Sequence, residues 1–333
     1  MRFAQRSITF ARFFIVSILV SSAHAEWYSD KRAIMGTAVS VELWADDDAD
    51  ADKKAHAAIE AVMQEMTRID QTMSPYIETS ELALINREAV QHPVKISDEM
   101  FMLLKTSIHY SQISHGAFDI SYASVGYMYD YRNHVKPSDA QIASHLSAID
   151  YRSIVLDEKA HTVHFMKPGM RIDLGGIAKG YAVDLGANIL QARGIANAIV
   201  TAGGDSRILG DRRGRPWMVG IKDPRAENKS AVVLPLSDTA ISTSGDYERY
   251  FMDGERRVHH IINPKTGKSA TGIRSVSVLA PHGIDTDALT KPLFILGVQR
   301  GMEIIDKIPG VDAIVIDDQG QLFYSRNLAP PSN

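Results

Sequence analysis

The segment Arg171–Asp184, which reads RIDLGGIAKGYAVD, constrains the fold of this chain more than any other. Ile172–Leu174 predicts the end of a buried strand, and Gly175–Gly176 then turns the chain into a helix. Two glycines let a backbone approach a ligand closely, and the N-terminal end of a helix attracts anions. Asp173 and Lys179 flank this turn. Taken alone, the pattern favours a plain strand-to-helix turn with a surface lysine, because short glycine motifs are common.

The rest of the chain predicts an α+β fold. Val39–Leu43 alternates as a half-buried strand does, and apolar residues recur at helical spacing over Ile59–Ile69 and between Ser97 and Gly116. Short β-rich runs dominate later: Ile154–Leu156, Val163–Phe165, Ala198–Thr201, Trp217–Ile221, Val232–Leu234, Ser275–Leu279 and Ala313–Ile316. Helices are expected at Gly176–Gln191, near Asp285–Leu296 and at Gly301–Lys307. This order lacks regular βαβα alternation, so antiparallel pairs are expected in one large domain or two closely joined lobes.

Residues 1–25 predict a secretory signal peptide. They hold a basic start, a short apolar run and an A-x-A cleavage site, which are Arg2, Arg6 and Arg12, Phe13–Val20, and Ala23–Ala25. The apolar run is shorter than the ~20 residues of a membrane span. We therefore expect residues 26–333 to form an exported, periplasmic chain without a membrane span; an uncleaved N-terminal anchor is the alternative. The chain has no cysteine, which excludes disulfides and lipid attachment at a cleavage-site thiol. Its net charge of −4 and lack of a basic stripe argue against nucleic-acid binding.

Eight short segments rich in glycine and polar residues follow one another along the chain. They are Met35–Thr37; Met73–Tyr76 with Ser80–Leu82 and Asn86; Gly116–Asp119; Asp173–Lys179; Ala202–Asp205; Ser242–Tyr247; His260–Pro264 with Thr266–Gly267; and Asp287–Leu289 with Leu293–Gly297. In this order the set closely resembles the FAD:protein FMN transferases, the ApbE-type flavin transferases of bacteria. The resemblance covers roughly residues 35–320.

The resemblance implies a single compact α+β domain over residues 26–333. Its two lobes would be closely joined, with mixed, largely antiparallel sheets and a nucleotide crevice. The family cleaves FAD at its pyrophosphate and attaches FMN through a phosphoester bond to a threonine or serine of a partner protein, with AMP leaving. The implied partner is a subunit of a redox complex. Hydrolysis of FAD to FMN and AMP, or non-catalytic binding of FAD in the periplasm, are the alternatives.

The resemblance also implies which residues contact FAD. These are Met35, Tyr76, Ala117, Phe118, Asp119, Asp173, Lys179 and Ile261. Plain core packing is the alternative for Phe118 and Ile261, and half-buried packing for Tyr76. Asp205 follows a glycine pair, and we expect it to hydrogen-bond its own turn rather than a ligand.

Magnesium is the metal that the resemblance implies. Its ligands would be the backbone carbonyl of Gly176, the carboxylate of Asp287 and a threonine four residues later, but that third position is Lys291, followed by Pro292. The Lys291 ammonium could pair with Asp287 at i,i+4 and partly replace the metal. Alternatively, a helix could begin at Pro292 and leave Lys291 pointing elsewhere. We expect a metal site that is retained but altered.

His260 is the candidate general base. A neutral imidazole with an ordinary pKa of ~6.5 could take the proton of an incoming hydroxyl. The alternative is a histidine that hydrogen-bonds the turn at Asn263–Pro264, with Asp246 as the next candidate base. Neighbouring residues of a strand face opposite ways, so at most one of His259 and His260 lines a site.

Overall fold

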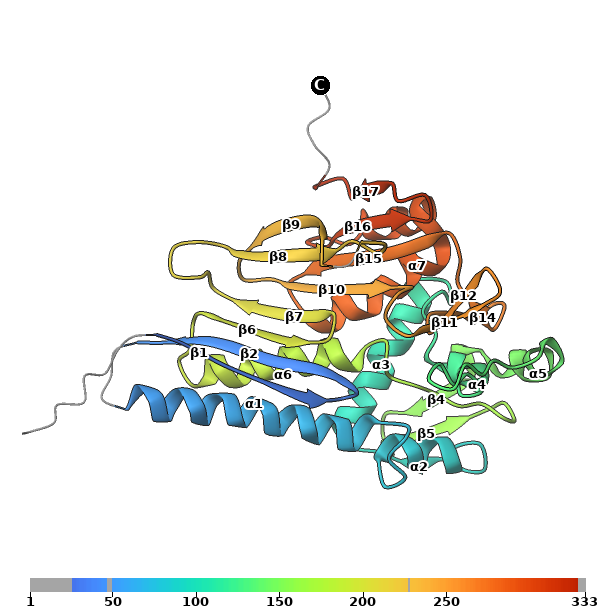
Figure 1. The fold of residues 1–333 in the computed structure, drawn as a ribbon. Coiled ribbons are helices and arrows are strands. Elements are labelled where there is room, and N and C mark those ends of the chain that lie inside the picture. Colours follow the sequence, from blue (N-terminus) through green and yellow to red (C-terminus); the bar gives the residue numbers. More distant parts are fainter. Residues whose placement is uncertain (1–25, 47–49, 227, 329–333) are drawn as a thin grey trace, which may run out of the picture.

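An eight-stranded antiparallel sheet forms the centre of the molecule (Figure 1). The chain is described from a computed structural model, which places residues 26–46, 50–226 and 228–328. From one edge to the other the strands are β1 (Glu26–Ile34), β2 (Thr37–Ala45), β6 (Ala198–Ala202), β7 (Asp205–Leu209), β10 (Ala240–Gly245), β15 (Ile273–Ala280), β16 (Asp312–Asp317) and β17 (Leu322–Tyr324). All neighbouring strands in this sheet pair antiparallel. The expected signal peptide lies outside the described residues.

In the β1–β2 hairpin, the local sequence determines which face of β2 is buried and where the chain turns. Val39, Val41 and Leu43 alternate along β2 and are fully buried, as predicted. The turn is Met35–Gly36, and both residues have positive φ angles, 56° and 65°. Such a two-residue turn matches the right-handed twist of the strands it joins.

Three helices pack on one face of the sheet: α1 (Ala51–Met73), α6 (Ala178–Ala192) and α7 (Gly283–Ile305) (Figure 1). The predicted apolar face of α1 is buried from Ile59 to Ile69. Helices α6 and α7 touch through their backbones, because a Cβ atom at Gly180 would lie 2.0 Å from the carbonyl oxygen of Gly283. Asp184 caps α7 by accepting hydrogen bonds from the amides of Gly283 (2.7 Å) and Ile284 (2.9 Å).

Hydroxyl groups join α7 to strand β10. Ser242 bonds Thr286 at 2.7 Å, and Ser244 bonds Thr290 at 2.9 Å. Each threonine also donates its hydroxyl hydrogen to a carbonyl of its own helix, at 2.9 and 2.8 Å. A hydroxyl has one hydrogen, so the serines are the donors in these pairs.

The opposite face of the sheet is covered by the hairpin β8 (Trp217–Lys222) and β9 (Ser230–Leu236). A separate apolar cluster joins this hairpin to the sheet; it consists of Ile208, Trp217, Ile221, Leu236, Ile241, Leu279 and Ile314. The sheet is therefore covered on both faces.

The eight-stranded sheet, the helices α1, α6 and α7 and the β8–β9 hairpin form the first lobe. The second lobe lies beside it and shares its apolar core. Its elements are α2 (Glu81–Glu88), α3 (Asp98–Ile113), α4 (Ala123–Gly126), α5 (Asp139–His145), the 3-10 turns Ile120–Tyr122, Leu146–Ala148 and Tyr151–Ser153, and a small sheet of β3 (Val94–Lys95), β5 (Thr162–Phe165) and β4 (Ile154–Asp157). Phe165 and Leu103 belong to the same apolar cluster as Val278 and Leu293 of the first lobe. The prediction of a single α+β domain with largely antiparallel sheets is confirmed. Within the described ranges, no helix is long and apolar enough to span a membrane.

The predicted strand at Ile172–Leu174 is wrong. Both residues are fully buried, but the segment belongs to no sheet. The side chain of Asn86 hydrogen-bonds the amide and the carbonyl of Ile172 at 2.7 and 2.9 Å. A side-chain amide therefore supplies what a neighbouring strand would otherwise provide.

Candidate functional site

Two carboxylates and two ammonium groups meet where α6, α7 and β7 come together. The Lys179 ammonium bonds Asp205 and lies 3.7 Å from Asp287 Oδ2, while Lys291 bonds Asp287 Oδ1 and, at 2.9 Å, the Asp287 backbone carbonyl. Asp287 is fully buried and Asp205 nearly so. We call these four residues the charged cluster. The expectation that Asp205 bonds its own turn is wrong, because its carboxylate pairs with Lys179.

The two carboxylates of this cluster are shifted in opposite directions. Burial acts to raise the pKa of Asp287, but Lys179 and Lys291 outweigh it and hold that pKa below its usual value. Burial and the neighbouring Asp287 raise the pKa of Asp205, against the opposing effect of Lys179. Burial would lower the pKa of Lys179, yet the two carboxylates raise it above its ordinary value. Both ammonium groups therefore have an anionic partner.

The double-glycine turn lies directly against the cluster. A Cβ atom at Gly176 would be 3.3 Å from Lys291 Cε and 3.3 Å from the Phe118 ring. The amide of Gly175 donates to Asp173 Oδ1 at 2.6 Å. Helix α6 then begins at Ala178 without a side-chain cap at its N-terminus. The turn thus joins the stem of Lys291 to the N-terminus of the helix that carries Lys179, and a helix N-terminus with nearby cations suits a phosphate.

His260 lies close enough to Lys179 and Lys291 for their charges to act on its pKa. Its Nδ1 atom is buried and has no hydrogen-bond partner among the described residues. Burial, followed by the charge of Arg249 and then by His259 and the cluster lysines, lowers the pKa of His260 to about 3. The imidazole is therefore neutral at physiological pH and has a free nitrogen.

The adjacent His259 has a structural role. It is buried, and its Nε2 atom lies 2.9 Å from the Ala270 carbonyl oxygen. His259 is the last residue of strand β12 (Arg256–His259), which pairs with β11 (Tyr250–Asp253). The ring of His259 is hydrogen-bonded and Nδ1 of His260 is not, so the environments of the two histidines differ, as expected for neighbouring residues. The side chain of Asn263 accepts from the Lys265 amide at 2.9 Å. The turn at Asn263–Pro264 follows strand β13 (Ile262–Asn263), which pairs with β14 (Lys268–Ser269). Within the part of the chain described, no hydrogen bond joins the His260 ring to this turn.

The other predicted FAD contacts divide into two groups. Ala117, Phe118 and Ile261 are buried, and Phe118 also touches the glycine turn. Tyr76 is 87% exposed, so it is not the half-buried packing residue that was the alternative.

Two further predicted contacts have backbone roles. Met35 donates its amide to Asp70 at 3.3 Å. The Asp119 carboxylate accepts from the amide and hydroxyl of Ser121 at 2.9 and 2.6 Å and from the Tyr151 amide at 3.0 Å. These bonds make Asp119 a cap of a 3-10 turn. The roles of all these residues toward FAD stay predictions.

Arg249 is a cation that the sequence reasoning missed. It is exposed, its guanidinium lies near Gly36, and its charge acts on the pKa of Asp173 and His260. The signal was present, because Arg249 follows the Ser242–Tyr247 segment by two residues. Asp246 of that segment is held by both guanidinium nitrogens of Arg225, at 2.9 and 2.6 Å, which suits a structural anion better than a free base.

The residues present do not fit a magnesium ion in this arrangement. Mg²⁺ requires about six oxygen ligands in octahedral geometry. Lys291 offers no oxygen, and its ammonium bonds both the carboxylate and the carbonyl of Asp287. Across the described ranges, no group of three or more His, Cys, Asp or Glu residues could hold a metal. The alternative of a helix beginning at Pro292 is wrong, since α7 begins at Gly283 and Pro292 lies inside it.

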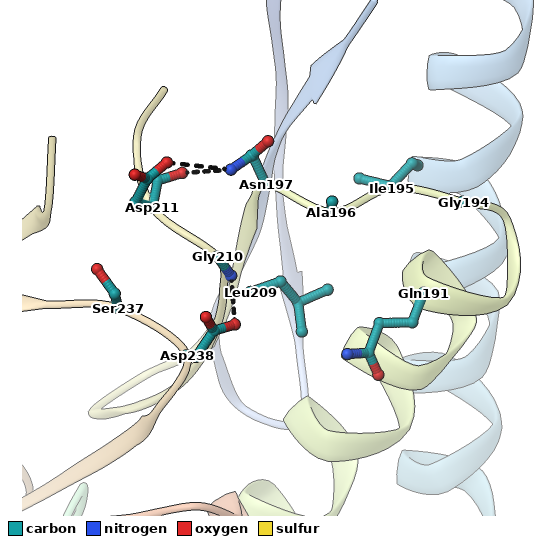
Figure 2. Close-up of a pocket in the computed structure, with 10 residues that line it drawn as sticks. All are labelled: Gln191, Gly194, Ile195, Ala196, Asn197, Leu209, Gly210, Asp211, Ser237 and Asp238. Carbon is teal, nitrogen blue, oxygen red and sulfur yellow. Dashed lines mark hydrogen bonds between the residues drawn. The ribbon is translucent and has the colours of Figure 1, made fainter. Parts of the chain in front are cut away.

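Figure 2 shows the residues that line a pocket of about 660 Å³. The last turn of α6, the end of β7 and the segments just before β6 and β10 form its walls: Gln191, Gly194, Ile195, Ala196, Asn197, Leu209, Gly210, Asp211, Ser237 and Asp238. Gln191 is about 18 Å along α6 from Lys179, given a rise of ~1.5 Å per residue. The pocket shares no residue with the charged cluster or the glycine turn.

Comparison with known proteins identifies the family. The model of the ApbE family matches residues 35–315. The FAD:protein FMN transferase of Treponema pallidum is 31% identical, with 88% of this chain and 85% of that protein covered, and that of Haemophilus influenzae is 32% identical with 82% of each covered. The crystal structure of the ApbE protein from Thermotoga maritima superposes with a TM-score of 0.82 at 31% identity, and covers 91% of this chain and 98% of its own. The flavin transferase ApbE from Vibrio cholerae gives a TM-score of 0.78 at 28% identity with the same coverage. The chain belongs to the ApbE family.

Proposed function

We propose that this chain is a flavin transferase that cleaves FAD and attaches FMN to a hydroxyl group of a partner protein. The names of its relatives support the activity. The observation in the structure that carries it is the unpartnered Nδ1 atom of His260, whose pKa is lowered by burial and then by the charges of Arg249 and the cluster lysines. Phosphoryl transfer depends mainly on alignment and charge neutralisation, and these groups can provide both.

The reaction is balanced without any further reactant. The oxygen of the acceptor threonine or serine forms a bond to the phosphorus of the FMN half. The bond from that phosphorus to the bridging oxygen of the diphosphate breaks, and AMP leaves as an anion. In this proposal the proton of the hydroxyl passes to the imidazole of His260, which is neutral before the substrate arrives.

The other residues bind and orient. Lys179, near the uncapped N-terminus of α6, and the exposed Arg249 neutralise the diphosphate. The glycine turn lets the diphosphate approach the backbone. The exposed ring of Tyr76 supplies aromatic surface for the flavin or the adenine, and the buried ring of Phe118 packs against the glycine turn.

The setting of the reaction is part of the proposal. The pattern of residues 1–25 supports export, and we infer a periplasmic enzyme whose acceptor is a subunit of a redox complex. The magnesium ion that the resemblance implies has no role in the steps above, because the residues present do not fit it.

The test is to incubate the purified protein with FAD and a candidate flavoprotein subunit and to measure the mass of the subunit. A gain equal to FMN less water, with AMP released, supports the transferase. Free FMN and AMP without a mass gain would identify a pyrophosphatase, and unchanged FAD would identify a binding protein. His92→Ala, which alters an exposed histidine, is the matched control for His260→Ala.

A further inference from the structure

We propose that the ammonium group of Lys291 occupies the cation position of this site, so that the chain binds the FAD diphosphate without a divalent metal ion. The inference rests on the proposed function, since it concerns how the same site neutralises the same substrate.

The position of Lys291 is set by contacts along its whole length. Its aliphatic stem lies against the glycine turn, because a Cβ atom at Gly176 would be 3.3 Å from Cε and 3.8 Å from Cδ. Its ammonium bonds the carboxylate and the carbonyl of Asp287, a residue with no exposed surface. About 18% of the side chain remains exposed. The positive charge is therefore anchored to Asp287 beside the turn, on a side chain that is not fully buried.

The ammonium has a donor to spare. A lysine carries three N–H donors, and Asp287 takes two of them. No third hydrogen bond from this group is found within the described parts of the chain. The remaining donor can reach a phosphate oxygen placed over the turn.

The charge balance favours this arrangement over a metal. Asp205 and Asp287 formally carry two negative charges, and Lys179 and Lys291 carry two positive ones. The cluster is therefore neutral before the substrate arrives. A divalent ion would add two positive charges to it and would compete with an ammonium for the same carboxylate oxygen. With a threonine at position 291, the cluster would carry one negative charge and a hydroxyl ligand, and a divalent ion would be favoured.

The experiment is a calorimetric titration of FAD into the full-length protein, once in EDTA and once in excess Mg²⁺, together with a titration of Mg²⁺ alone. We expect FAD to bind with the same affinity in both buffers and Mg²⁺ alone to give no binding heat. Two variants sharpen the comparison. Lys291→Thr should lose affinity for FAD in EDTA by about ten- to a hundredfold, the range for one charge-assisted hydrogen bond, and should regain it in Mg²⁺.

Lys291→Met is the matched variant, because methionine has a similar length but neither charge nor oxygen. It should show the same loss in EDTA and no recovery in Mg²⁺. Lys307→Thr changes an exposed lysine just beyond α7 and should behave like the wild type in both buffers. The wild-type titrations decide the matter even if a variant fails to fold.

Two results would overturn the proposal. One is wild-type protein that binds FAD in Mg²⁺ but not in EDTA; the other is a Lys291→Met variant that binds FAD in EDTA as tightly as the wild type. Both leave the proposed function intact, because FAD still binds. Wild-type protein that binds FAD in neither buffer would instead remove the proposed function, and this inference with it.

Discussion

Replacing Gly180 with alanine tests whether the contact between α6 and α7 holds the site together. A Cβ atom there would lie 2.0 Å from the carbonyl oxygen of Gly283 and 2.7 Å from Asp287 Cβ. Ordinary contacts begin near 3.4 Å, so the two helices would have to separate locally by about 1.4 Å, the difference between 3.4 and 2.0 Å. The separation would also break the hydrogen bond from the Gly180 amide to Asp287 Oδ2, now 3.1 Å.

The expected loss follows from two opposing effects. Alanine is favoured over glycine in a helix by about 1 kcal/mol. Overpacking typically costs about 1–3 kcal/mol, and here the upper end applies because one of the clashing groups is backbone and cannot rotate away. We expect the free energy of unfolding to fall by about 2 kcal/mol, as measured by urea denaturation, and the affinity for FAD to fall with it.

Gly186→Ala in the same helix is the matched control. Its Cβ atom would meet the ends of three side chains, Val200, Val62 and Met66, at 3.0–3.3 Å, and these can shift. We expect this variant to lose less stability and to keep its affinity for FAD. If Gly180→Ala proves as stable as the wild type and binds FAD equally well, the close helix contact does not position Asp287.

Three further predictions concern the rate of FMN transfer, the pH dependence of stability and the affinity for FAD. His260→Ala should lower the rate of FMN transfer by about 10²–10⁴-fold while FAD affinity changes only a few-fold; a wild-type rate would make His260 structural. Because the pKa of His260 is lowered from 6.5 to about 3 in the folded protein, the unfolded chain binds more protons between these values, so stability should fall as pH falls from 6.5 toward 3. His260→Gln should flatten that part of the stability profile, and an unchanged profile would contradict the assignment. FAD should bind more tightly than FMN in calorimetry, because the expected contacts extend from Tyr76 to Asp173 over both nucleotide halves; equal affinities would exclude a contribution from the adenosine half.

Periodicity predicted the elements with one clear apolar face. It did not predict β10, because Ser242 and Ser244 are polar residues buried against the threonines of α7. It misassigned Ile172–Leu174, since burial alone does not distinguish a strand from a segment that a side chain such as Asn86 satisfies.

The site could be predicted where its residues are close in sequence. The pair Asp287–Lys291 follows from i,i+4 spacing on a helix. The pairing of Lys179 with Asp205 joins residues of different elements, and no local pattern carries that information. Arg249 lies two residues after the Ser242–Tyr247 segment, but its place beside the β1–β2 turn depends on how distant segments fold together.

The serine–threonine bonds between β10 and α7 determine more than how firmly the helix is held. Apolar side chains can repack when a helix rolls or slides by a fraction of a turn, but hydrogen bonds are directional and do not permit this. Two such bonds, which Thr286 and Thr290 accept, lie on either side of Asp287 along the helix. Since each residue turns a helix by about 100°, even a small rotation would aim Asp287 away from Lys179. The two serine–threonine bonds thus limit the rotation of α7 about its own axis. The orientation of Asp287 toward Lys179 therefore depends on hydroxyl groups that do not belong to the charged cluster.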